Sequence, residues 1–220
     1  MKKGKRLFLV SGFRGAGKST LLALALSKRL AIFGIDLDPF FQKTKFPCKP
    51  SEHEMTLEEA LECGSWITFN HIAPLNKLIQ QPENITIHLD YVSFLLQSKF
   101  CLGRTPAEVG LHFSQKNNAY EFIDSLFIYL DNFLLRNYEA IFFNTLFTPW
   151  EIIRTRLVDR NYPDSSFSYF ISRSNSIGEK MHYHFYKAWS QKINSYKPNI
   201  NLVTEFRDSE ISITDVTGAL

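Results

Sequence analysis

The segment Gly12-Phe-Arg-Gly-Ala-Gly-Lys-Ser19 is the feature that most constrains the fold of this chain. It matches the pattern G-x-x-x-x-G-K-[ST], in which a glycine-rich turn directs its backbone N–H groups toward a phosphate. The apolar run 7–10 precedes the turn, and a helical pattern over residues 18–29 follows it. Because a phosphate-binding turn of this kind joins a buried strand to a helix, the order predicts an α/β fold.

The chemistry of a phosphate site explains the composition of the turn. Lys18 would place a positive charge on the β- and γ-phosphate oxygens, and the Ser19 hydroxyl would complete the coordination of Mg²⁺. We therefore expect a nucleoside triphosphate with Mg²⁺ as the ligand and Lys18 as a catalytic residue. The residues expected to bind the phosphates are Gly12, Arg14, Gly15, Ala16, Gly17, Lys18, Ser19 and Thr20.

Apolar runs alternate with helical patterns along the rest of the chain. Further strands are expected at residues 31–35, 85–89, 140–143, 167–171 and 200–203. Further helices are expected at residues 119–136 and 178–196, and one with a capping box begins at residues 56–61. The alternation predicts a single domain over residues 1–220. Its fold class is α/β, a Rossmann-like P-loop NTPase with a mainly parallel sheet flanked by helices on both faces.

Composition excludes several other classes of protein. Hydrophobic residues make up 45% of the 220 positions and charged residues 21%, a balance that excludes a disordered chain. The net charge of +3 is too small to indicate a nucleic-acid-binding protein by itself. The odd set of cysteines, Cys48, Cys63 and Cys101, does not suit a disulfide framework. No apolar run reaches the length of a membrane span, so a cytoplasmic protein without membrane insertion is expected.

Two carboxylates follow the second expected strand. Asp36 and Asp38 are two positions apart and precede Pro39, at a strand end that would face the same crevice as the glycine-rich turn. One carboxylate would hold Mg²⁺ through water, and the other would orient or deprotonate an attacking oxygen. The alternative is a solvated turn, in which Asp and Pro are common.

The segment Asp36-Leu-Asp-Pro39, with the glycine-rich turn upstream, resembles the ParA/MinD family of P-loop ATPases, which position DNA, division sites and surface machines. The resemblance continues in the same order over residues 6–216. Its other segments are Thr56-Leu-Glu-Glu-Ala-Leu61, Asn137-Tyr-Glu-Ala-Ile-Phe-Phe-Asn144-Thr145, Tyr169-Phe-Ile-Ser-Arg-Ser-Asn175 and Val203-Thr-Glu-Phe-Arg207.

This resemblance implies ATP and Mg²⁺ as cofactors. It also implies that Asp36 belongs to the magnesium shell and that Asp38 positions the hydrolytic water. Asn175, with Arg173, would lie near the adenine. The implied function is spatial positioning or assembly regulation by a nucleotide-gated homodimer that recruits a protein partner, with non-specific DNA as a further partner.

Three departures from the family pattern affect this expectation. Phe13 stands where the family has a lysine that reaches the partner's phosphates, and Arg14 is the candidate substitute. Asn144 replaces the acidic residue expected at the end of its strand. The segment from Lys18 to Asp36, 18 positions, is shorter than usual in the family. The resulting hypothesis is an ATPase whose hydrolysis is impaired or absent.

Small-metabolite kinases of the shikimate and adenylylsulfate type provide an alternative from another class. They also follow the phosphate loop with a strand that ends in Asp-x-Asp, and the short segment before Asp36 suits them. Asp38 would then contact the acceptor hydroxyl, and residues 154–160, with three arginines, would form the base of a mobile lid. GTP-dependent metallochaperones resemble residues 12–22, but their Cys-x-Cys metal motif is missing.

Three further features, a basic segment, a histidine pair and an acidic tail, do not by themselves predict a functional site. Residues 151–200 contain eight Lys or Arg against four acidic residues, which indicates either a solvated face or contact with DNA phosphates. His182 and His184 are two positions apart and so point to different sides of a helix, which disfavours a metal pair. The acidic tail at residues 208–220 lacks the basic amphipathic helix of a membrane anchor.

Overall fold

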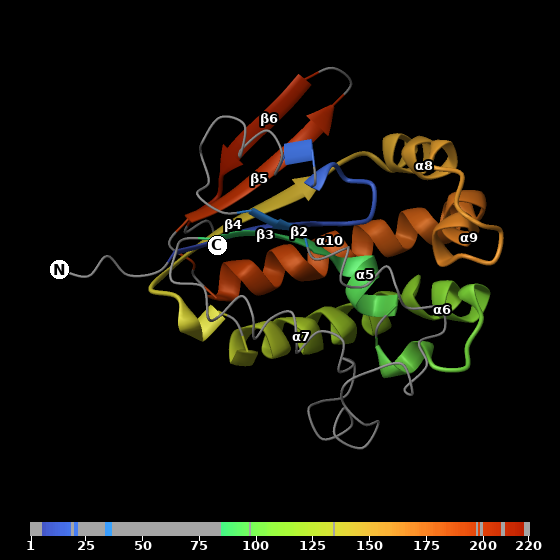
Figure 1. Cartoon of the computed structure of the whole chain (residues 1–220), viewed down its shortest axis with the longest axis horizontal. Helices are drawn as coiled ribbons and strands as arrows, with labels where there is room; N and C mark the ends of the chain where they lie inside the picture. Colours follow the sequence, from blue (N-terminus) through green and yellow to red (C-terminus); the bar gives the residue numbers. More distant parts are fainter. Residues whose placement is uncertain are drawn as a thin grey trace.

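In the computed structural model, the residues described are 6–18, 20–21, 34–36, 85–96, 98–133, 135–196, 198, 200–207 and 210–217. Their six strands form one sheet in the order β2-β3-β1-β4-β5-β6 (Figure 1). Strands β1 to β5 are parallel, and β6 pairs antiparallel with β5 at the edge. The strands are β1 (Arg6–Gly12), β2 (Gly34–Asp36), β3 (Ile85–Asp90), β4 (Ala140–Phe147), β5 (Ile200–Arg207) and β6 (Glu210–Asp215).

Two long helices, α7 and α10, run side by side along one face of this sheet (Figure 1). A third helix, α6, begins where Thr105 and Glu108 form a reciprocal capping box. The helices in the described part of the chain are α5 (Tyr91–Leu96), α6 (Pro106–Phe113), α7 (Lys116–Phe133), α8 (Trp150–Asp159), α9 (Phe167–Arg173) and α10 (Asn175–Tyr196), with 3₁₀ turns η3 (Lys99–Cys101) and η4 (Leu135–Asn137).

Aromatic rings fill the space between these helices and the sheet. Phe122 of α7 stacks on Phe185 of α10 with ring centroids 5.5 Å apart. Trp189 of α10 meets Phe143 of β4 edge to face at 6.2 Å. All four side chains are buried. Because large buried rings contribute strongly to packing, this layer holds α10 against β4 and thereby fixes the start of α8, which follows β4.

The alternation of strands and helices is confirmed over most of the described chain. The strands expected at 85–89, 140–143 and 200–203 are β3, β4 and β5, and the helices expected at 119–136 and 178–196 are α7 and α10. The strand expected at 31–35 overlaps β2, of which residues 34–36 are described. The helix expected at 18–29 is described only at residues 18, 20 and 21, and the helix start at 56–61 lies outside the described residues.

The strand expected at residues 167–171 is wrong, because this segment is helix α9. The Ser166 hydroxyl accepts a hydrogen bond from the Tyr169 backbone N–H and caps the helix. Phe167 and Ile171, four positions apart, are both buried on one helical face. An apolar run this short does not distinguish a strand from a short helix, and the cap decides the outcome.

The acidic tail also adopts a structure that its composition did not indicate. Residues 210–215 form β6, which extends the sheet beyond β5. None of the helices in the described part of the chain combines the length and the apolar character needed to cross a bilayer.

Candidate functional site

The turn after β1, residues 12–18, is here called the glycine loop. It begins at the centre of the sheet, where Gly12 lies between Asp90 of β3 and Leu146 of β4. Gly15 and Gly17 have φ angles of 85° and 99°, which side chains with a Cβ rarely adopt. Lys18 then starts a helix. The local sequence therefore produces a turn of alternating backbone conformation at the carboxyl end of β1, as an anion-binding nest requires.

The Lys18 side chain is buried and crosses the glycine loop. Its Nζ donates a hydrogen bond to the Phe13 carbonyl oxygen at 2.8 Å. The same atom lies 3.3 Å from Oδ2 of Asp90, whose side chain is also buried. Because a buried ammonium is stable only when its charge is compensated, these two contacts hold the lysine charge at the ends of β1 and β3.

Asp90 is held in one orientation by the chain that follows it. Its Oδ1 accepts hydrogen bonds from the backbone N–H groups of Val92 at 2.9 Å and Ser93 at 3.2 Å, at the start of α5. Its Oδ2 faces Lys18 and lies 3.6 Å from Nε of Arg14. A fixed carboxylate next to a glycine-rich turn has the chemistry of a ligand for Mg²⁺, which usually takes one or two protein carboxylates and otherwise water and phosphate oxygens.

Asp90 was not among the residues that the sequence pattern predicted for this site. The alternating strand at 85–89 was expected, but not that this strand would be the neighbour of β1. The available signal was an acidic residue directly after an apolar strand, the same signal that drew attention to Asp36. Among the described residues, no group of three or more His, Cys, Asp or Glu side chains forms a metal cluster.

Arg14 connects the glycine loop to two helices. Its two terminal nitrogens donate to Ser93 Oγ in α5 at 2.7 Å and to Ser168 Oγ in α9 at 3.0 Å. The guanidinium is thus held by three partners at once, counting Asp90. The planar guanidinium has several N–H donors and can therefore bind several partners at once. Through Ser168 it links the position of α9 to that of the loop.

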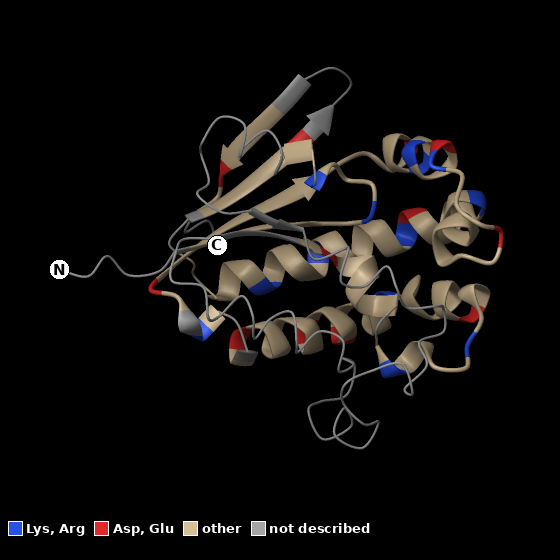
Figure 2. Ribbon diagram, viewed as in Figure 1, with Lys and Arg blue, Asp and Glu red and all other residues tan. Residues whose placement is uncertain are grey.

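Helix α8 also reaches the glycine loop. Arg156 donates to the Gly15 carbonyl oxygen at 2.9 Å, and Thr148, just before α8, donates to the Ala16 carbonyl oxygen at 2.9 Å. Burial lowers the pKa of Arg156, and the nearby Arg160 charge lowers it further. Figure 2 shows basic residues in α8 and in the turn after β1. Arg14, Lys18 and Arg156 outnumber the single carboxylate of Asp90 by two charges, which favours an anionic ligand.

The structure brings together most of the residues that the sequence analysis assigned to phosphate binding. Gly12, Arg14, Gly15, Ala16, Gly17 and Lys18 all belong to the glycine loop, where Lys18 contacts the Phe13 carbonyl and Arg14 contacts Asp90. Thr20 is exposed in the helical segment that follows. Ser19 and Asp38 lie outside the described residues, so the roles given to them stay predictions.

Asp36 is farther from the glycine loop than expected. It ends β2, which is separated from β1 by β3, and its register partner is His88. With neighbouring strands about 4.8 Å apart, the backbone of Asp36 lies roughly 10 Å to the side of β1. Only its backbone is described, so its assignment to Mg²⁺ stays a prediction. Asp90 occupies the adjacent strand end that Asp36 was expected to approach.

The expected adenine residues have other contacts within the chain. The Arg173 guanidinium lies 5.4 Å from the centre of the Tyr169 ring. Asn175 begins α10, not a loop after a strand, and its side-chain oxygen accepts a hydrogen bond from Trp150 Nε1. Their proximity to adenine stays a prediction. The strand that was expected to place them, at residues 167–171, is helix α9.

Phe13 and Asn144 are also positioned by the tertiary structure. Phe13 is buried and contacts the rings of Trp150, His182 and Phe185, although it belongs to the glycine loop. Asn144 does not end its strand, because β4 continues to Phe147. Its side-chain oxygen accepts a hydrogen bond from Thr204 Oγ1 of β5 at 2.9 Å.

No protein-family model matches this chain, and no curated protein matches it either. The resemblance to the ParA/MinD family and the likeness to small-metabolite kinases therefore depend on the sequence segments that suggested them. What the structure adds is a mixed α/β domain with a mainly parallel sheet. At the carboxyl end of its central strand, a cationic glycine loop lies beside the carboxylate of Asp90.

Proposed function

We propose that the chain is an ATP-dependent phosphotransferase, which moves the γ-phosphoryl group of the nucleotide to a hydroxyl group of a small acceptor. The observation that carries the proposal is the pairing of Lys18 with Asp90 at the glycine loop, under a helix whose Arg156 contacts the same loop. Phosphoryl transfer requires cations and a carboxylate around the phosphates, because its catalysis is mostly positioning and charge stabilisation.

The phosphates would lie against the backbone N–H groups of the glycine loop. Lys18 would exchange its contact with the Phe13 carbonyl for the phosphate oxygens, a change of partner that costs little because both are oxygen acceptors. Asp90, with Ser19 as the predicted second ligand, would hold Mg²⁺ beside the phosphates. When bound, Mg²⁺ would neutralise the charge that develops on the phosphate oxygens.

Helices α8 and α9 favour transfer to an acceptor over hydrolysis. They are linked to the glycine loop by Arg156 and Arg14, and to each other by Arg154, which donates to the Ser172 carbonyl oxygen at 3.0 Å. A segment that covers the phosphates with arginines excludes water, and exclusion of water is what separates a transferase from a hydrolase. The acceptor would lie near Asp36 and Asp38, as the kinase hypothesis predicts.

The ParA/MinD-like hypothesis receives less support from the contacts around the glycine loop. Phe13 lies in the core, and Arg14, the candidate for reaching a partner's phosphates, is engaged by Ser93 and Ser168 of its own chain. A role across a dimer would require Arg14 to leave both serines and Asp90. The nucleotide-gated dimer stays a prediction, and the experiment below distinguishes it from phosphoryl transfer.

The test combines transfer of ³²P from γ-labelled ATP to a panel of small hydroxyl-bearing metabolites with measurement of oligomeric state with and without ATP. We expect a labelled acceptor and no ATP-dependent dimer. Lys18→Ala should lose nucleotide binding by at least about 100-fold, because the charge facing the β- and γ-phosphates is removed. Asp90→Asn should retain binding of ATP without Mg²⁺ and lose transfer.

Glu139→Asn provides the matched control for Asp90→Asn, because Glu139 is an exposed acid that lies before β4, away from the loop. It should leave binding and transfer unchanged. ATP-dependent dimerisation without labelling of any acceptor would favour the ParA/MinD-like hypothesis. Normal ATP binding by the folded Lys18→Ala variant would contradict both hypotheses, since both depend on the same loop.

A further inference from the structure

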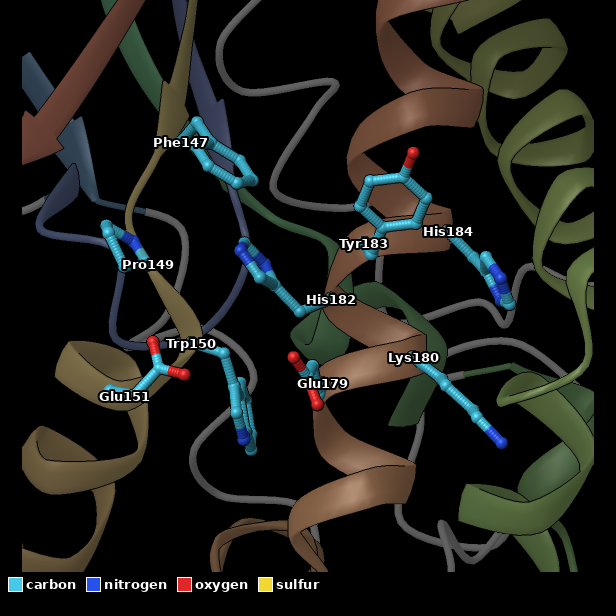
Figure 3. A pocket seen from close by; sticks show the side chains of 9 residues that line it. All are labelled: Phe147, Pro149, Trp150, Glu151, Glu179, Lys180, His182, Tyr183 and His184. Atoms are coloured by element: carbon cyan, nitrogen blue, oxygen red, sulfur yellow. The ribbon is translucent and has the colours of Figure 1, made fainter.

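A pocket lies behind the glycine loop, between the β4–α8 junction and α10 (Figure 3). Its volume is about 430 Å³, within the range of small-molecule sites. Phe147 and Trp150 line it from the junction, and His182 and Tyr183 line it from α10. Phe13 separates it from the phosphate side, because this loop residue packs against Trp150 and His182. The pocket is therefore distinct from the proposed nucleotide site.

Aromatic side chains form the apolar part of the pocket. The His182 ring stacks on Phe147 with centroids 5.2 Å apart and on Trp150 at 6.3 Å. Trp150 reaches this position because α10 has a glycine opposite it: a Cβ on Gly178 would overlap the indole ring. Tyr183 is 50% exposed, and Lys187 Nζ lies 5.5 Å from the centre of its ring. An aromatic or aliphatic ligand body would find ring faces on both sides of the pocket.

Two carboxylates give the pocket its charge. Glu151 of α8 and Glu179 of α10 are exposed and point toward the same gap between their helices (Figure 3). Neither forms an ion pair with any residue that the structure describes. With Lys180 as the one cationic lining residue, the pocket carries a formal charge of −1. A monocation would neutralise this charge, and aromatic ring faces attract cations as well.

His182 adds a buried imidazole that the Thr148 backbone partners only weakly. Its side chain is 3% exposed, and neither ring nitrogen makes a hydrogen bond of good geometry within the described part of the chain. Burial lowers the pKa of His182 to about 4, and the Thr148 backbone opposes this shift only in part, so the ring is neutral at pH 7. A buried polar atom without a partner is costly, and an N–H donor on a ligand would supply one.

We propose that this pocket binds a small organic amine, a monocation whose ammonium group lies between Glu151 and Glu179 and whose apolar body packs against Phe147, Trp150 and Tyr183. The aromatic faces, the unpaired carboxylates and the neutral imidazole each favour this class over an anion or a neutral apolar molecule. Nucleotide binding is not needed for this site.

The test uses three probes of nearly equal size and different charge: 2-phenylethylamine, 2-phenylethanol and phenylacetate. Binding to the whole chain is measured by titration calorimetry and by NMR observation of the Trp150 indole N–H, without nucleotide. We expect saturable binding of the amine and at least tenfold weaker binding of the alcohol and the acid. Equal binding of all three probes, or no saturable binding of the amine, would overturn the proposal.

Variants then assign the binding to this pocket. The double substitution Glu151→Gln and Glu179→Gln should weaken amine binding at least tenfold, and His182→Phe should weaken it several-fold. Glu121→Gln, at an exposed acid on α7, is the matched control and should bind as the parent does. Unchanged amine affinity in the double variant would contradict the proposal. Lys18→Ala should leave the amine affinity unchanged, so failure of this site is distinguishable from failure of the nucleotide site.

Discussion

The glycine loop and the aromatic layer beneath it are held by opposite kinds of interaction. The loop is fixed by polar cross-links to three helices and to the β4–α8 junction: Arg14 to Ser93 and Ser168, Arg156 to Gly15, and Thr148 to Ala16. The layer between α7, α10 and β4 is fixed by rings such as Phe122 and Trp189. Polar cross-links can exchange partners with a ligand, whereas ring packing cannot. We infer that the aromatic layer supplies stability and the loop supplies function.

The largest effect is expected from breaking the aromatic layer. Phe122→Ala would remove a fully buried ring that stacks on Phe185 and has no polar contact with the loop, although Phe185 also contacts Phe13. The free energy of unfolding should fall by about 3–5 kcal/mol, as for other large-to-small core substitutions. Chemical denaturation measures this change. ATP affinity of the folded fraction should stay at the parent value. A loss of affinity would contradict the inference that the aromatic layer supplies stability and the loop supplies function.

The contact between the glycine loop and the aromatic layer is expected to make the free energy of unfolding depend on pH. His182 contacts Phe13 of the loop and Phe147 of the sheet, and burial holds its pKa at about 4, below its ordinary value of 6.5. Between these values the unfolded chain binds the proton more readily than the folded chain, so stability falls as the pH falls from 6.5 toward 4.

From pH 7 to pH 5 this residue should contribute a loss of about 2 kcal/mol in the free energy of unfolding. The pKa values of His112 and His184 are also lowered by burial, so they add to the loss in the same direction. Denaturation curves across this pH range for the parent and for His182→Phe isolate the share of His182. If the parent and His182→Phe lose stability equally as the pH falls, then His182 is not a source of the pH dependence.

A smaller effect is expected from loosening one polar cross-link. Arg156→Gln would remove the cation that donates to the Gly15 carbonyl. ATP affinity should fall about tenfold, about 1.4 kcal/mol, since one charge near the phosphates is lost. Calorimetric titration measures the affinity. Arg160→Gln, at the exposed C-cap residue that follows α8, serves as the comparison and should have less effect. A change in the free energy of unfolding comparable to that of Phe122→Ala would show that the loop is a structural element.

The smallest effect belongs to a site that is remote from both regions. Thr105→Ala would remove the capping box of α6, in which Thr105 and Glu108 exchange hydrogen bonds. Loss of an N-cap costs about 1 kcal/mol of stability. Thermal denaturation should show a small decrease in melting temperature, with ATP affinity unchanged. Thr105→Ser retains the hydroxyl and should recover the parent value.

The sequence was sufficient to predict the glycine loop and the elements with strong periodicity. The turn at residues 12–18 carries its own conformational requirement in Gly15 and Gly17, and α7 and α10 are long enough for their apolar pattern to be unambiguous. The short segment α9 was mistaken for a strand because its length fits both structures. The partners of Asn144 and Asn175 lie on β5 and α8, so no local pattern contained them.

What the sequence by itself determined is a glycine-rich loop that ends in a lysine, because backbone freedom and charge at adjacent positions are local properties. Which carboxylate lies beside that lysine was decided only by the tertiary structure. Asp36 and Asp90 both end parallel strands, but strand order places β3, and therefore Asp90, next to β1. Strand order depends on how the whole chain buries its apolar faces, and that is a property of the assembled sheet and not of any single segment.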